Sequence, residues 1–161
     1  MVDKEKVVPV PAPWRALPSF HVGGLTDVGF AESDGQEFLL VVSHNGRGVF
    51  DFDGNRVARD DTGLDDTWHD ARALTAQGIG PLEGVRVPIV GLSGGGFPLT
   101  TGDDWSVAHE DEGRVELTAP DGSSRLIHND DFFEVRAVGF SLSGKAIVIA
   151  TAGECYLFTR S

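Results

Sequence analysis

The sequence contains a single cysteine, little positive charge and no long apolar run. Cys155 is the only cysteine in 161 residues, so no disulfide can form within the chain. It lies in an apolar, strand-like run with no histidine or cation nearby to lower its pKa, which predicts a buried thiol in a reducing compartment. The opening residues mix acids, lysines and prolines and lack the apolar stretch of a signal peptide or membrane helix. We therefore expect a cytoplasmic protein without a membrane partner.

Positive charge is scarce: 13 lysines and arginines stand against 25 aspartates and glutamates, and the formal net charge is -12. Such a chain repels phosphate backbones and anionic lipids, which argues against direct binding of nucleic acid. It attracts basic proteins instead. The acids occur in groups: Asp60, Asp61, Asp65 and Asp66; Asp103 and Asp104; Glu110, Asp111 and Glu112; Asp130 and Asp131. Solubility alone is the alternative explanation for these groups.

Strong catalytic and metal-binding motifs are also missing. Residues 91–95 satisfy the G-x-S-x-G pattern and resemble the nucleophile elbow of α/β-hydrolases, with His109 and His128 as conceivable bases for Ser93. The glycines after Ser93, followed by Pro98, disfavour the helix that this family places there. No phosphate-loop lysine follows the glycines, and the five histidines show no metal-like spacing. We expect no enzymatic activity, no cofactor and no metal.

Glycine is abundant, with 21 residues, and four of these glycines follow aspartate or asparagine, while others in turn positions follow glutamate, serine or alanine. Near both chain ends such turn signals recur roughly every eight to eleven residues, the spacing of successive antiparallel strands. Apolar and polar residues alternate in 114–118, which predicts a strand with one buried face. Residues 38–42 and 146–150 are apolar throughout, which predicts strands covered on both sides. We predict an all-β fold of antiparallel meanders, forming a small propeller, a two-sheet sandwich or an incomplete barrel.

Two segments depart from the strand pattern. Residues 1–19 contain four prolines and are expected to form an extended leader, with residues 20–161 as a single β domain. Within that domain, Trp68, Ala71 and Leu74 are spaced as on one face of a helix, between an aspartate that can cap it and a glycine that can end it. We predict one short helix over residues 64–77.

The two ends of the chain contain an internal repeat. Residues 26–30 (TDVGF) align with 136–140 (RAVGF), and each copy continues through a serine-containing turn, an apolar strand, a glycine turn and an aromatic strand. The second copy, VRAVGFSLSGKAIVIATAGECYLF, resembles a blade of the WD40 type of β-propeller. The resemblance implies a propeller-like arrangement, although Leu157-Phe158 stands where that family has its Trp-Asp pair.

Aromatic residues follow three of the acidic pairs. Aromatic rings supply buried area at interfaces, and neighbouring carboxylates attract and orient a basic partner. The predicted partner-binding residues are Asp65, Asp66, Trp68, Asp103, Asp104, Trp105, Asp130 and Asp131, with Phe132 and Phe133 following the last pair. The alternative is that Trp68, Trp105 and Phe132 are core residues that the acids merely flank.

These features together predict a non-enzymatic domain that binds a basic protein. The profile of a small, acidic chain without a catalytic constellation is similar to that of bacterial immunity proteins, and the similarity implies an inhibitor that covers the active site of a cognate toxin. Two alternatives stay open: a propeller-like scaffold module of a larger complex, and a serine hydrolase that uses Ser93 and His109.

Overall fold

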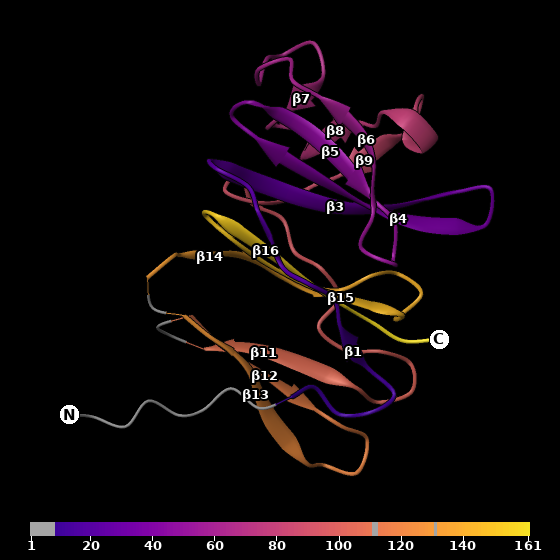
Figure 1. Ribbon diagram of the computed structural model, residues 1–161, viewed down its shortest axis with the longest axis vertical. Helices are drawn as coiled ribbons and strands as arrows, with labels where there is room; N and C mark the ends of the chain where they lie inside the picture. Colours follow the sequence, from indigo (N-terminus) through magenta and orange to yellow (C-terminus); the bar gives the residue numbers. More distant parts are fainter. Residues whose placement is uncertain (1–8, 111–112, 131) are drawn as a thin grey trace.

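The computed structural model describes residues 9–110, 113–130 and 132–161, and almost all regular structure in these residues is β (Figure 1). The strands form four antiparallel sheets that are stacked along the long axis of the molecule. Two inner sheets each lie between two others, and two outer sheets end the stack. None of the described sheets closes into a barrel. The predicted all-β fold of antiparallel meanders is therefore confirmed.

The first inner sheet has the strand order β10-β3-β4-β5-β6. The strands are β3 (Leu25–Ser33), β4 (Gln36–Ser43), β5 (Gly46–Phe50), β6 (Arg56–Asp60) and β10 (Val90–Gly91). Four of them follow one another along the chain as hairpins, with β4 between β3 and β5. Strand β10 lies later in the sequence and pairs with β3 on the side opposite β4.

The second inner sheet contains β14 (Val135–Phe140), β15 (Ala146–Thr151) and β16 (Glu154–Thr159). Its edge is completed by two short strands from the beginning of the described chain, β1 (Arg15–Ala16) and β2 (Phe20–His21), which both pair with β16. The proline-rich segment is therefore joined to this sheet from residue 15 onward, and Trp14 is buried beside it.

The two outer sheets are small. One contains β7 (His69–Asp70), β8 (Thr75–Gln77) and β9 (Arg86–Pro88), with the 3-10 turn η1 (Gly80–Leu82) between β8 and β9. The other contains β11 (Ser106–Glu110), β12 (Arg114–Thr118) and β13 (Ser124–Asn129). In β12 the buried residues are Val115 and Leu117, so the predicted one-faced strand is confirmed.

Three hydrophobic cores fill the three spaces between the four sheets. Side chains alternate across a strand, so one inner strand serves two cores. In β4, Leu40 packs toward the β7–β9 sheet, whereas Leu39 packs toward the second inner sheet. In β15, Ile149 packs toward the β11–β13 sheet, whereas Val148 packs toward the first inner sheet. The prediction that residues 38–42 and 146–150 are covered on both sides is confirmed.

The glycines of the internal repeat lie where one crossing segment passes both inner sheets. A Cβ atom on Gly29 in β3 would lie 2.2 Å from the carbonyl oxygen of Pro88. A Cβ atom on Gly139 in β14 would lie 2.2 Å from Cβ of Phe97 and 2.9 Å from the carbonyl oxygen of Pro98. Residues 88–98 therefore cross first one repeat and then the other, and each crossing requires a residue without a side chain.

The predicted helix over residues 64–77 is wrong, because this segment forms turns and the β7–β8 hairpin. The predicted capping residues, Asp65 or Asp66, precede no helix; the carboxylate of Asp65 accepts the backbone N–H of Thr67, and that of Asp70 accepts the backbone N–H groups of Arg72 and Ala73, all within turns. Leu74 has a φ of 55°, which is incompatible with a right-handed helix. Local turn bonds of aspartate here compete successfully with the helical pattern.

Candidate functional site

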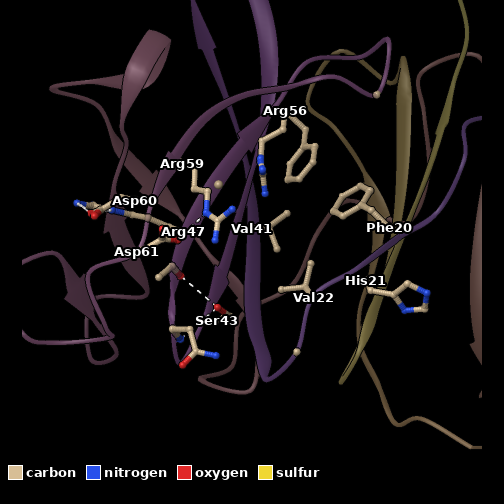
Figure 2. Close-up of a pocket in the computed structure, with 16 residues that line it drawn as sticks. Phe20, His21, Val22, Val41, Ser43, Arg47, Arg56, Arg59, Asp60 and Asp61 are labelled. Carbon is tan, nitrogen blue, oxygen red and sulfur yellow. Dashed lines mark hydrogen bonds and ion pairs between the residues drawn. The ribbon is translucent and has the colours of Figure 1, made fainter.

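A cleft of about 480 Å³ lies between one edge of the first inner sheet and the segment that carries β2 (Figure 2). One wall comes from β4, β5 and β6, and the opposite wall comes from residues 20–23. The two inner sheets share a core along β3, β14 and β15. Because β-sheets are twisted, two packed sheets diverge toward their edge strands, and the cleft lies where they diverge. The volume falls within the range of ligand-binding pockets in proteins.

Three arginines belong to the cleft, and one of them is fixed by its neighbours. Arg47 donates from Nε and Nη2 to Oδ2 of Asp60, at 3.1 and 3.0 Å. The side chain of Arg47 is only 11% exposed, so this guanidinium is part of the wall. Hydrogen bonds from the backbone and side chain of Thr62, and then from Arg47, hold the pKa of Asp60 below its usual range.

The other two arginines are exposed to the open side of the cleft. Arg59 donates from Nε to Oδ1 of Asp61 at 2.6 Å, and both side chains are more than half exposed. The side chain of Arg56 has no hydrogen-bond or ion-pair partner among the residues that the structure describes. Figure 2 shows Arg56 and Arg59 extending into the space across from Phe20 and Val22.

The floor of the cleft is apolar. The rings of Phe20 and Phe50 are stacked, with centroids 4.0 Å apart and planes inclined by 16°. Val41 lies beside them and is almost fully buried. Gly48 pairs with Arg59 across the β5–β6 ladder, so this strand position adds no side chain to fill the space. The cleft therefore combines guanidinium groups at its rim with an aromatic surface below them.

The first predicted acidic cluster lies in the loop before β7. Asp65 and Asp66 are exposed, and Oδ1 of Asp65 accepts the backbone N–H of Thr67 at 2.7 Å. Hydrogen bonds from Thr67 hold the pKa of Asp65 below its usual range. Trp68 is 5% exposed and lies beneath the guanidinium of Arg47, 4.4 Å from its ring centroid. Its ring is thus part of the core between the first inner sheet and the β7–β9 sheet.

The second cluster lies in the loop before β11. Asp103 binds Arg160 through both carboxylate oxygens, at 2.6 and 2.9 Å. The guanidinium of Arg160 holds the pKa of Asp103 well below its usual range. Asp104 is exposed, and Trp105 is 6% exposed, with its ring 5.8 Å from the ring of Trp14. Trp105 is therefore also a core residue.

The third cluster follows β13 and differs from the other two. Phe132 is 83% exposed and Phe133 is 38% exposed, and their rings meet edge to face at 5.0 Å. Oδ1 of Asp130 accepts the backbone N–H of Phe132 at 2.9 Å. The predicted Asp131 lies outside the described residues. Here an aromatic ring is presented to solvent directly beside a carboxylate.

The structure does not bring the three clusters together. The first belongs to the β7–β9 sheet, which lies at the opposite end of the stack from the β11–β13 sheet (Figure 1). Strands β11 and β13 both run antiparallel to β12, so the start of β11 and the end of β13 lie at opposite ends of their sheet. A single partner of ordinary size would therefore contact one of these clusters at a time.

Ser93 contacts a carboxylate rather than an imidazole. Its Oγ lies 3.4 Å from Oδ2 of Asp27, and its backbone N–H donates to Oδ1 of Asp27 at 3.2 Å. His69 Nε2 lies 3.4 Å from the same Oδ2, and Asp27 is completely buried. A serine nucleophile needs the histidine between the serine and the acid. This network instead connects β3, β7 and the loop after β10.

Sequence reasoning missed both the cleft arginines and the buried Asp27. Arg47, Arg56 and Arg59 account for three of the 13 basic residues, and this local concentration was a usable signal in an acidic chain. The opposite wall, however, comes from Phe20, which is distant in sequence. Asp27 was visible as a charged residue inside the apolar stretch LTDVGF, but its partners are far along the chain.

No family model matches the chain, and neither does any curated protein or solved structure. Among the described residues, no helix has the length and apolar character needed to cross a membrane. Within the same residues, histidine, cysteine and acidic side chains do not gather in a group of three or more that would hold a metal ion.

Proposed function

We propose that the protein is a non-enzymatic domain that binds a basic protein partner. We further propose that the aromatic corner, defined as Asp130, Phe132 and Phe133, is central to the contact. The observation that carries the proposal is the exposure of Phe132 beside a carboxylate. Exposed aromatic residues next to charge are frequent energetic centres of protein interfaces.

The aromatic corner is favoured over the other two acidic clusters because of what their side chains already contact. Trp68 and Trp105 are buried, so neither ring is available to a partner without unfolding of its loop. The charge of Asp103 is balanced by Arg160. The loops before β7 and β11 therefore contribute mainly long-range negative potential, which accelerates association with a basic protein.

The aromatic corner is continuous with the segment that carries β2. The ring of Phe133 lies 3.1 Å from the position of a Cβ atom on Gly153. The carbonyl oxygen of Gly153 accepts the backbone N–H of Val22 at 3.0 Å, and Glu154 pairs with His21 at 3.1 Å. One surface thus extends from the aromatic corner across Glu154 to His21 and Val22 at the wall of the cleft.

The finer form of this proposal is an immunity protein that covers the active site of a basic toxin. The net charge of -12 supports it, since a basic enzyme that acts on nucleic acid has a complementary surface. In that case binding abolishes the partner's activity. A propeller-like scaffold module would instead be recovered in a multi-subunit complex, without inhibition.

The test is copurification from the native host with matched variants of two exposed apolar residues. Phe132→Ala removes the exposed ring of the aromatic corner, and Leu142→Ala removes an equally exposed residue (88%) in a distant turn. We expect the Phe132 variant to bind a stoichiometric basic partner at least about tenfold more weakly, with no change for the Leu142 variant. Equal recovery with both variants would remove the aromatic corner from the interface.

The serine hydrolase alternative has its own test. A fluorophosphonate probe labels serines whose hydroxyl is activated by a base. We expect Ser93 to stay unmodified, because its Oγ faces the carboxylate of Asp27. Stoichiometric labelling that disappears in Ser93→Ala would contradict the non-enzymatic proposal.

A further inference from the structure

We propose that the cleft between β5–β6 and β2 binds a single carboxylate group attached to an apolar body. This inference goes beyond the proposed protein partner: the ligand contacts Arg56, Phe20 and Phe50, none of which belongs to the aromatic corner. The charge of the cleft differs in sign from that of the chain as a whole.

The cleft holds one unbalanced positive charge. Three guanidinium groups stand against two carboxylates, because Arg47 pairs with Asp60 and Arg59 pairs with Asp61. Arg56 is left without a partner among the described residues that surround it. A guanidinium group binds a carboxylate through two parallel N–H···O bonds. One unpaired guanidinium accordingly matches a monoanion better than a phosphate ester with two charges.

The floor of the cleft matches an apolar group. Phe20, Phe50 and Val41 line the floor below the arginines; Phe50 and Val41 are buried, and Phe20, which is only partly buried and stacks on Phe50, presents the apolar surface to the cleft. A planar or branched apolar body on this surface removes aromatic area from water, and this burial supplies most of the affinity of a small ligand. The carboxylate of such a ligand then lies at the level of Arg56.

Gly48 keeps the cleft open between the arginines and the floor. A Cβ atom on Gly48 would lie 3.4 Å from Cε2 of Phe50 and 3.6 Å from Cδ of Arg56, which is ordinary contact. A larger side chain at this position would therefore occupy the cleft without displacing backbone. By contrast, a Cβ atom on Gly46 would lie 2.0 Å from the carbonyl oxygen of Asp60, so that position cannot be used for a blocking variant.

Titration of the full chain with two pairs of probes tests the inference. One pair is 3-phenylpropionate and its amide, and the other is N-acetyl-glycyl-phenylalanine and its amide; inorganic phosphate is the fifth probe. We expect each acid to bind at least about tenfold more tightly than its amide, because a charge-assisted pair with arginine is lost in the amide. Tighter binding of the peptide assigns the carboxylate to a chain terminus, and tighter binding of phenylpropionate assigns it to a free acid.

Three variants locate the site. Arg56→Gln should weaken acid binding at least about tenfold and leave amide binding unchanged. Gly48→Val should weaken both acid and amide, because it fills the cleft. Arg125→Gln, which changes an exposed arginine on β13, should change neither. Circular dichroism and the urea midpoint verify that the variants fold.

The inference is overturned if acid and amide bind equally, if neither acid saturates, if phosphate binds more tightly than both acids, or if Arg56→Gln has no effect. Phe132→Ala should bind the acids as the unmodified chain does. A failure of the cleft is therefore distinguishable from a failure of the aromatic corner.

Discussion

The two inner sheets and the two outer sheets bury their apolar side chains in different ways. Inner strands such as β4 and β15 are buried along their full apolar runs, because a second sheet covers each face. Outer strands such as β12 bury alternate residues and expose or half-expose the others. Charged and aromatic side chains that are accessible to a partner or ligand lie on the outer sheets, at sheet edges or in loops. The inner sheets thus provide stability, and the periphery is free to carry binding residues.

The largest expected effect compares the same truncation in an inner and an outer strand. Leu40→Ala in β4 and Leu117→Ala in β12 both remove a leucine that is at most 1% exposed. Such truncations destabilise proteins by about 2–5 kcal/mol, depending on how far the surroundings collapse into the cavity. We expect Leu40→Ala near the upper limit, because β4 is covered on both faces and its backbone cannot shift to fill the cavity, and Leu117→Ala nearer the lower limit, because β12 is covered on one face only. Urea unfolding measures the difference.

Equal losses in both leucine variants would mean that an outer sheet is held as rigidly as an inner one. The two kinds of sheet would then differ in the exposure of their side chains but not in how far their backbones can shift to fill a cavity.

A smaller effect concerns the segment that crosses both inner sheets. Gly29→Ala places a Cβ atom 2.2 Å from the carbonyl oxygen of Pro88, so backbone must move. We expect a loss of about 1–3 kcal/mol in the free energy of unfolding, the usual magnitude for overpacking. Gly96→Ala is the control within the same crossing segment, since no atom lies within 4 Å of its added Cβ. An unchanged free energy of unfolding in Gly29→Ala would show that the crossing segment is loosely packed against β3.

The smallest effect is a pH dependence in an outer sheet. Burial lowers the pKa of His128 below its ordinary value of 6.5, while Asp130 and Glu154 oppose this shift and His109 adds to it. The native state therefore favours neutral His128, and the unfolded state takes up the proton first as pH falls. This stability contribution is complete above the ordinary pKa and is lost as pH falls through 6.5 toward the lower native pKa.

We expect His128→Phe to remove this part of the pH dependence. Urea unfolding at about pH 7.5 and about pH 5.5 should show a smaller loss of stability on acidification in the variant than in the unmodified chain. The same loss in both proteins would show that His128 is protonated equally in the folded and unfolded states.

Sequence reasoning succeeded where a local pattern reports a local environment. Continuous apolar runs identified the strands with two covered faces, and alternation identified β12 as a strand with one. Glycine after aspartate or asparagine marked the hairpin turns. Burial of Cys155 was also predicted, and that burial raises the pKa of its thiol.

The same reasoning failed over residues 64–77, where the helical spacing of Trp68 and Leu74 was outweighed by side-chain bonds that aspartates make within turns. It also could not decide which aromatic residues are exposed. Trp68, Trp105 and Phe132 all follow acidic residues, yet two are core residues and one is 83% exposed. Exposure depends on which sheet packs over each loop.

By itself, the sequence determined the antiparallel strands, their turns, the faces that must be buried and the excess of negative charge, because each of these follows from neighbouring residues. Only the tertiary structure decided that four sheets form an open stack and that residues 15–21 complete the edge of β16. It also placed Phe20 opposite Arg56 in one cleft. These outcomes depend on contacts between residues far apart in the chain, and no local pattern encodes which distant surfaces will meet.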